Sequence, residues 1–396
     1  MPVVRTVPLH QVNAPAPGPP RLIELPNGTP VWLITRYNDV HQVLTDPRFE
    51  RSPVHAPDTP PVLDSPSLLD SRDSIGRQDG DGHLRLRRAV GQAFTPRAVE
   101  HLRPWVAEVV DQLLDDLVAK GPPADLVTDY ALPLPCKVIH RLLAVDHVPT
   151  ERLIHWAEHA FPGASAASED GDQARGELTD FATTLITERR RSPGDDLVSS
   201  VVQATDREGG IPEAALVNLI ATMVVGGHDT TMTMLSNSLL YLLTEQPAAW
   251  HRLGSDEQTA AVLTERLLHL IPLGDREERP GHVLAATADI RLGGVTVRAG
   301  DFVTTDHVAA NRDSAAFPGN PHDPDNLFTP LPKPSLAFGA GRHYCLGTWL
   351  ARAELQLALH RLAGRLPALR LTIAADDIVW RHGTVTRSPF HLPSAW

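Results

Sequence analysis

The feature that most constrains the fold is the stretch FGAGRHYCLG, residues 338–347, near the carboxyl end of the 396-residue chain. It places Cys345, one of only two cysteines, behind a Gly-x-Gly turn and just before a strongly helical run. Free cysteines are usually small buried hydrophobic residues. At a helix N-terminus, however, the dipole and the unpaired N–H groups favour the thiolate form. A packing role and a ligand role for Cys345 are both open at this point.

The residues around Cys345 restrict what it could bind. A zinc site would need further soft ligands, and no second cysteine lies near it in the sequence. The glycine fingerprint of a phosphate-binding loop fails because Tyr344 occupies its third glycine position. A thiolate in an apolar pocket lined by N–H groups suits haem iron, where a cysteine ligand favours O–O cleavage.

Composition predicts a folded chain with a large core, because 42% of its residues are hydrophobic and 21% are charged. No Gly/Ser-rich linker divides it, so we expect one domain over residues 1–396, with a proline-rich leader at 1–20. A net charge of −12 argues against a nucleic-acid partner. Two cysteines give no disulfide framework, and the N-terminus has neither a signal peptide nor a membrane helix. These features indicate a cytoplasmic protein without a membrane partner.

Periodicity predicts a mainly α fold with a minor β portion. Residues 211–247 read as one long apolar helix of about 50 Å, enough to cross a domain. Residues 288–306 read as a β-hairpin that turns at Gly293-Gly294. The other expected elements are a strand running into a helix at 30–46, two helices at 83–120 with boundaries near Pro96 and Pro104, helices within 149–191 around a loop at 161–172, and a helix at 256–270.

The long apolar helix carries a second chemical signal, the run GGHDTT at residues 226–231. Two adjacent glycines inside a helix cost about 1 kcal/mol each relative to alanine. Close packing against a neighbouring helix would account for Gly226 and Gly227 as well as a function would. A helix that bulges at these glycines would open a groove for O₂ and water, and Asp229 and Thr230 could then relay protons.

The cysteine loop closely resembles the haem-binding loop of the cytochrome P450 family, with every characteristic position filled. The resemblance extends to DPRFERS (46–52), ANRD (310–313) and the acid–alcohol pair Asp229-Thr230. It implies a fold with a long central helix over haem b and a small β-rich lobe. It also implies Cys345 as the axial iron ligand and Asp229 and Thr230 as catalytic residues. The cofactor-binding residues that it implies are His83, Arg87, Gly226, Gly227, Phe338, Gly339, Gly341, His343 and Gly347.

The resemblance fails at the Glu-x-x-Arg motif that family members carry on the helix before the hairpin. Here Arg266 stands in the place of the glutamate and His269 in that of the arginine, and the third member, in the later irregular stretch, becomes Asn326. We call Arg266, His269 and Asn326 the altered triad. Replacing every member of a buried network can be nearly neutral. We expect a neutral His269–Asn326 hydrogen bond, with Arg266 turned to a backbone carbonyl or a carboxylate.

The resemblance implies a monooxygenase that hydroxylates or otherwise oxidises a small, largely apolar molecule in bacterial secondary metabolism. The same chemistry could instead couple two carbons, or a carbon and a heteroatom. A third reading is a non-catalytic haem-binding relic, which only the altered triad supports. We expect O₂ and an electron-donor ferredoxin with its reductase as partners, the ferredoxin meeting a positive patch of Arg85, Arg88, Arg97 and Arg352. Substrate walls are expected at 64–80, at 155–185, at Met223, Val224 and Gly227 of the long helix, at 271–276 and in the turn 382–389.

Overall fold

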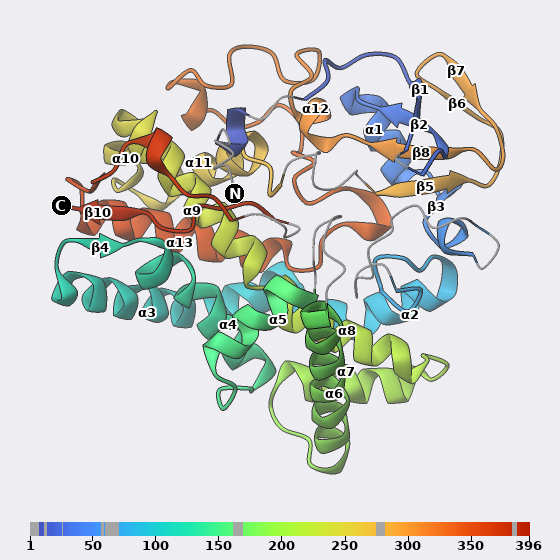
Figure 1. Ribbon diagram of the computed structural model, residues 1–396, viewed down its shortest axis with the longest axis horizontal. Coiled ribbons are helices and arrows are strands. Elements are labelled where there is room, and N and C mark those ends of the chain that lie inside the picture. The colour runs from blue at the N-terminus through green and yellow to red at the C-terminus, as the bar shows by residue number, and fades with distance from the viewer. Residues whose placement is uncertain are drawn as a thin grey trace.

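The protein is described by a computed structural model that covers residues 8–11, 14–25, 27–56, 59, 71–160, 169–274, 282–381 and 386–396. Within these residues helices dominate, and the strands form a small separate portion, as expected (Figure 1). The sheet of β1, β2, β8, β5 and β3 lies at one end, and the helices fill the rest.

The helices include those that the sequence predicted, but residues 211–247 form two helices rather than the single one expected, and the helices at 133–143, 197–208, 247–253 and 307–311 were not predicted. Their bounds are α1 Tyr37–Thr45, α2 Gly80–Gly91, α3 Pro96–Lys120, α4 Pro133–Leu143, α5 Thr150–Ala160, α6 Glu169–Arg191, α7 Leu197–Glu208, α8 Glu213–Gly226, α9 Asp229–Thr244, α10 Pro247–Leu253, α11 Glu257–Leu270, α12 His307–Asn311 and α13 Thr348–Arg365. Two boundaries differ from the prediction. Pro104 lies inside α3, whose Thr95 cap and buried face hold it together, and α6 begins at Glu169 within the expected loop.

The strands form one mixed sheet and two small ones. The mixed sheet is antiparallel between β1 (Arg21–Glu24) and β2 (Pro30–Ile34), and parallel between β2 and β8 (Phe302–Thr305). The strand β5 (Val283–Ala286) pairs antiparallel with β8 and with β3 (Phe49–Glu50). The remaining strands are β4 Ala124–Asp125, β6 Ile290–Leu292, β7 Val295–Val297, β9 Arg370–Leu371 and β10 Pro393–Ala395.

The predicted hairpin is confirmed in β6 and β7. Ile290 pairs with Val297 and Leu292 with Val295, which leaves Gly293 and Gly294 at the turn. Both glycines have positive φ, 55° and 95°, which other residues rarely adopt. The turn that glycine permits therefore fixes the register of the hairpin.

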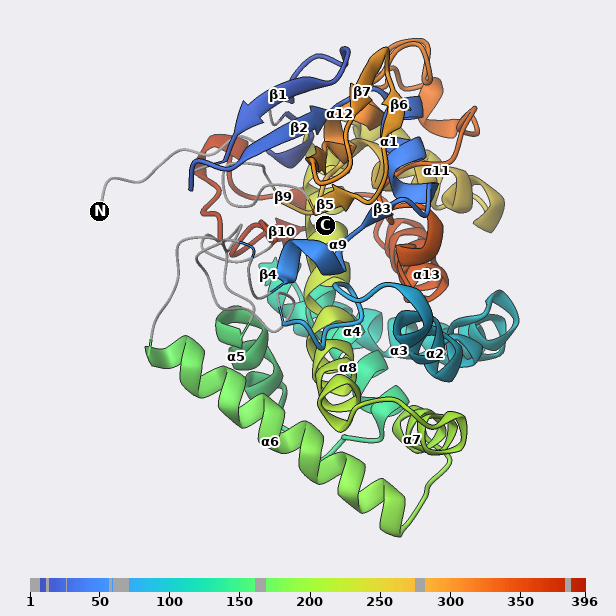
Figure 2. The same ribbon diagram turned by 90° about the vertical axis from the view of Figure 1, so that its right-hand side faces the viewer.

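The long apolar segment forms two consecutive helices, α8 and α9, that run through the middle of the molecule (Figures 1 and 2). Both are buried on most of their surface. In α8 the buried residues join a cluster with α5, α6 and α7, and those of α9 join a second cluster with α3, α11 and α13. The junction between the two helices thus lies where the two halves of the core meet.

No helix in the described residues is long and apolar enough to cross a membrane.

Candidate active site

The cysteine loop is shaped by two glycines in the left-handed region. Gly339 has φ 71° and Gly341 has φ 68°. A Cβ on Gly341 would collide with the backbone carbonyl of Leu44 in α1, so only glycine lets this loop approach α1. The N–H of Cys345 donates to the carbonyl of Phe338 at 3.0 Å, which closes the loop. Gly347 then caps α13, so Cys345 lies just before a helix N-terminus, as the sequence indicated.

The thiol of Cys345 experiences opposing influences. Burial among protein atoms raises its pKa, whereas the N–H of Gly347 and the guanidinium groups of Arg87 and Arg352 act to lower it. Its surface is nevertheless exposed, so the sulfur can be reached. The charges of two nearby arginines, together with the backbone N–H of Gly347, would stabilise the thiolate form of this accessible sulfur once a metal ion replaces the proton.

The ring of His83, in the first turn of α2, lies close to the ring of His343 in the cysteine loop. Their ring centroids are 4.3 Å apart, and His83 is 1% exposed with neither ring nitrogen hydrogen-bonded. Burial, with further contributions from His343 and Arg87, lowers the pKa of His83 to about 3. Arg87, one turn further along α2, donates to the carbonyl of Tyr344 at 2.7 Å. These basic groups and orphaned ring nitrogens converge beside the cysteine loop, which suits an anionic ligand group.

Two members of this cluster were missed by sequence reasoning. Asp79 accepts from His343 at 3.1 Å and from the backbone N–H of Arg51 at 2.6 Å. Burial alone would raise its pKa, but these bonds hold the pKa well below the usual range. Arg51 is buried, its Nε has no partner, and its charge acts on His83 and His343. The only available signal for Arg51 was its place in the DPRFERS stretch.

The segment 211–247 is interrupted at Gly226-Gly227, the glycine pair for which the sequence left a bulge and close packing both open. Helix α8 ends at Gly226, and helix α9 begins at Asp229. The hydroxyl of Thr230 donates to the carbonyl of Gly226 at 2.9 Å, a bond that occupies a carbonyl freed by the break. Gly226 is exposed and has only Thr222 within 4.0 Å of a built Cβ, whereas a Cβ on Gly227 would collide with Ile139 of α4. Gly226 therefore leaves open space, and Gly227 allows close helix packing.

Asp229 is held from the far end of the chain. The hydroxyl of Thr386 donates to its carboxylate at 2.6 Å, and Arg381 lies 3.9 Å from it. Arg381 also forms an ion pair with Glu158 of α5. Asp229 is thus tied to a carboxyl-terminal segment and, through Arg381, to α5. Neither Thr386 nor Arg381 could be identified from sequence, because they are more than 150 residues away in the chain.

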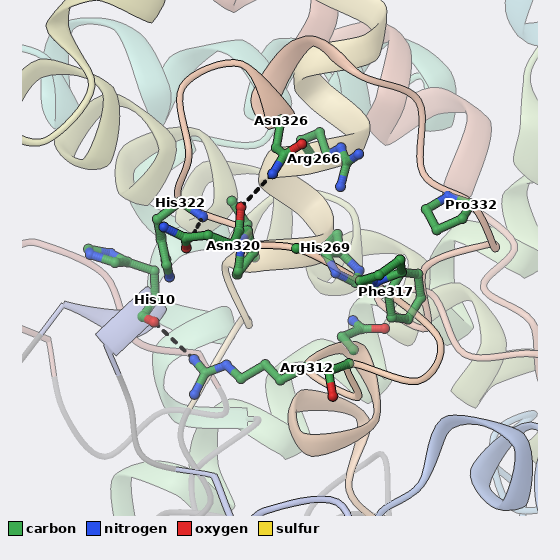
Figure 3. A pocket seen from close by; sticks show the side chains of 15 residues that line it. His10, Arg266, His269, Arg312, Phe317, Asn320, His322, Asn326 and Pro332 are labelled. Atoms are coloured by element: carbon green, nitrogen blue, oxygen red, sulfur yellow. Dashed lines mark hydrogen bonds between the residues drawn. The ribbon is translucent and has the colours of Figure 1, made fainter.

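The altered triad forms other contacts than we expected (Figure 3). Arg266 does turn to backbone carbonyls, donating to Thr329 at 2.6 Å and to Pro330 at 3.2 Å. The expected His269–Asn326 hydrogen bond is wrong. The His269 ring packs on Phe317 at 4.3 Å with Nδ1 unpartnered, and the amide of Asn326 donates to the carbonyl of Asn320. The short helix η6 (Asn326–Phe328) directs the Asn326 amide to the Asn320 carbonyl, so this amide is not available to His269.

Two arginines of the expected positive patch, Arg352 and Arg88, have acidic partners within the chain. Arg352 of α13 forms a two-point ion pair with Glu265 of α11, at 2.5 Å and 3.0 Å. Its guanidinium also lies 4.7 Å from the centre of the Phe338 ring. Arg88 pairs with Glu208 at 2.5 Å, which leaves Arg85 and Arg97 without an ion pair among the described residues. The patch is therefore smaller than predicted.

The expected substrate walls are described only in part. Residues 64–70, 161–168, 275–281 and 382–385 lie outside the described residues. Met223 is half-buried, but Val224 is fully buried in the core cluster of α5 to α8, so it does not face a ligand. Ile271 is also buried, and the carbonyl of Leu273 accepts from the N–H of Arg387.

Comparison with known proteins decides the family. Residues 279–365 match the sequence pattern of the family described as "Cytochrome P450". Nocardicin C N-oxygenase of Nocardia uniformis subsp. tsuyamanensis is 39% identical, over 98% of this chain and 96% of its own. The chain belongs to the cytochrome P450 family. Mycinamicin IV hydroxylase/epoxidase of Micromonospora griseorubida is 38% identical to this P450, over 94% of this chain and 91% of its own.

Solved structures agree with the assignment of the P450 fold. A cytochrome P450 with biaryl coupling reactivity, P450mel 107F1, superposes with a TM-score of 0.85 and 35% identity, over 96% of this chain and 93% of its own. The mixed-function P450 MycG in complex with mycinamicin V gives a TM-score of 0.80 and 37% identity, again over 96% and 93%.

Family membership makes haem the cofactor of this P450, and its residues fit that group. Both nitrogens of buried His83 lack partners, and the Nε of Arg51 does as well, which suits the carboxylates of a haem edge. The sulfur of Cys345 is accessible to a ligand, and the space beside Gly226 is open. When bound, a haem held by a thiolate supplies the chemistry of O₂ activation.

Proposed function

We propose that this P450 is a haem-thiolate monooxygenase that hydroxylates or otherwise oxidises a small, largely apolar natural product. A single domain spanning the chain would carry Cys345 as the iron ligand. His83, Arg87, His343 and Arg51 would hold the haem carboxylates. The observation that carries the proposal is the helix break at Gly226, where an accessible acid and alcohol stand side by side in the middle of the molecule.

The roles of the two residues follow from their bonds. Thr230 donates its hydroxyl proton to the Gly226 carbonyl, so its oxygen lone pairs are left to accept a proton-bearing partner from the groove. Asp229 is held by Thr386 and lies within reach of Arg381. Thr230 would orient O₂ and water, and Asp229 would supply protons from the Arg381 side. General acid–base groups of this kind contribute about 10²- to 10⁴-fold to rate.

The relay is tested with Thr230→Val and a matched control, Thr244→Val. Thr244 lies on the same helix, and its hydroxyl makes the same kind of bond, to Leu240 at 2.7 Å. With a surrogate ferredoxin system and an accepted substrate, we expect Thr230→Val to consume electrons while product per electron falls about 10-fold or more. Thr244→Val should match wild type. Equal coupling in both variants would contradict the relay.

Oxidative coupling is a second candidate, because a 35% identical neighbour is described as having biaryl coupling reactivity. A 33% identical relative is likewise named biflaviolin synthase. The product mass separates the two outcomes, since oxygen insertion adds one oxygen atom and coupling removes two hydrogens. The assay therefore needs no further variant.

The electron donor is proposed to be a ferredoxin supplied by a reductase, in the cytoplasm. Arg85 on α2 and Arg97 on α3 would meet an acidic protein. Charge reversal at Arg97, which is exposed, should slow reduction most at low ionic strength. An unchanged rate at low salt would move the docking site elsewhere.

A further inference from the structure

A cavity lies at the altered triad, and no residue of the cysteine loop is among its described lining residues. It measures about 260 Å³, several times the roughly 30 Å³ that one water molecule takes up in the liquid. Its walls come from α11, from α12 and from the irregular segment 314–332, with His10 on the amino-terminal side (Figure 3). Residues 318–320 are exposed, so the cavity communicates with solvent.

The described residues of the lining are rich in basic groups and include no carboxylate. Arg266 and Arg312 contribute two guanidinium groups, and His10, His269 and His322 contribute three imidazoles. His10 is already paired with Glu245 at 2.6 Å, and Arg312 donates to the carbonyl of His10 and lies near Asp306. These acidic groups, Glu245 and Asp306, therefore lie near the part of the wall formed by His10 and Arg312. The opposite side, with Arg266 and His269, has no acidic partner among the described residues.

Arg266 is the residue of this cavity that most needs an acidic partner. Its side chain is 8% exposed and bonds only to two neutral carbonyls, through Nε and Nη2. Nη1 has no hydrogen bond in the described part of the chain. A buried guanidinium without a counter-charge is unfavourable, since desolvation of a charge is repaid only by an opposite charge or good hydrogen bonds. The family glutamate that would belong to this helix is the residue that Arg266 replaces.

His269 adds a second unsatisfied group to the same wall. It is 6% exposed, and its Nδ1 has no hydrogen-bond partner. Figure 3 shows Arg266, His269 and Arg312 around the cavity from three different segments. A metal ion does not suit these residues, because the arginines would repel it and the described residues contain no group of ligands that could hold one.

We propose that this cavity binds one small oxyanion, a phosphate or a carboxylate, which contacts Arg266 and His269 and supplies the negative charge that the altered triad lacks. Planar and tetrahedral oxyanions both accept from a guanidinium in two-point fashion. The ligand would stabilise the segment 314–332 against α11. This proposal does not depend on the monooxygenase activity.

The test uses the haem-loaded protein and thermal unfolding. Sodium phosphate, sodium acetate and sodium chloride are compared at matched ionic strength, so that general screening is the same. We expect phosphate, acetate or both to raise Tm by about 2–5 °C in a saturable way, as a ligand of the native state does. The salt whose effect on Tm saturates at the lower concentration, phosphate or acetate, identifies the class of oxyanion. Equilibrium dialysis of phosphate should give one site per chain.

Variants locate the site. Arg266→Met should lose the oxyanion-dependent rise in Tm, whatever its own baseline, whereas Arg365→Met, at an exposed arginine of α13, should keep it. Asn320→Asp would place a carboxylate in the wall and keep the acceptor for the N–H of His322. It should raise Tm in chloride and reduce the response to oxyanions. If wild type responds equally to all three salts, or if Arg266→Met and Asn320→Asp respond as wild type does, the proposal is wrong.

Discussion

Glu265 and Arg266 are neighbours in α11, yet they join that helix to different parts of the molecule by different means. Glu265 reaches α13 and forms a two-point ion pair with Arg352, whose guanidinium also covers Phe338 of the cysteine loop. Arg266 reaches the segment 329–330 and finds only carbonyl oxygens. Within the described residues, Glu265 therefore has a charged partner on the side that carries Cys345, and Arg266 has none on the other side.

This difference explains how a chain with an altered triad can still hold Cys345 in position. The ion pair between Glu265 and Arg352 connects α11 directly to the helix that follows Cys345. Side-chain bonds from Arg352 to the hydroxyls of Tyr344 and Thr348 extend this connection into the loop. The altered triad secures a more distant segment. The missing acidic partner of Arg266 should therefore lower the stability of the protein more than it disturbs the position of the Cys345 sulfur.

The largest expected effect is that of Arg352→Met. Removing this partner leaves Glu265 uncompensated, and we expect a loss of about 2–3 kcal/mol of unfolding free energy, below the value for fully buried pairs because Glu265 is partly exposed. Arg365→Met on the same helix is the control, since its exposed pair with Asp115 should be worth about 0–1 kcal/mol. Denaturant unfolding measures both. Equal losses would remove the contrast between the two sides of α11.

A smaller effect concerns pH and His269. Burial, then Arg266 and Arg312, lower its pKa to about 4 from the ordinary 6.5. Between these values the unfolded chain binds a proton that the folded chain does not, so stability falls as pH falls below 6.5. We expect His269→Leu to remove about 2 kcal/mol of the loss between pH 7 and pH 5. The comparison is made in chloride, without oxyanions. Parallel curves for wild type and variant would contradict this account.

The smallest effect is expected for Asn326→Ala. Its amide makes one exposed hydrogen bond, to the carbonyl of Asn320 at 2.8 Å. We expect a loss of about 0.5–1 kcal/mol and unchanged haem retention. A loss of haem in this variant would show that the altered triad supports the cysteine loop after all.

The parts predicted from sequence depend on local residue chemistry. The cysteine loop needs Gly339 and Gly341 for its φ angles, the hairpin needs Gly293-Gly294, and the helix break follows Gly226-Gly227. Each signal lies within a few residues of the feature that it produces, so the sequence displays it directly.

The parts that sequence did not predict depend on distant partners. Thr386 holds Asp229 across 157 positions, and Arg352 finds Glu265 across 87. Asn326 was paired with His269 on family position alone, but its amide direction depends on how η6 sits over the 320 loop. Such contacts depend on how whole elements pack, which no short motif encodes.

The central claim is that Cys345 is held as a thiolate ligand despite the altered triad. The most direct test is the Soret spectrum of the purified, haem-loaded protein after reduction and addition of carbon monoxide. The account predicts the red-shifted band of a thiolate-ligated haem in wild type and in Asn326→Ala, and a reduced share of that band in Arg352→Met. A wild-type band at the position of a protonated or lost thiolate, or no haem uptake, would contradict it.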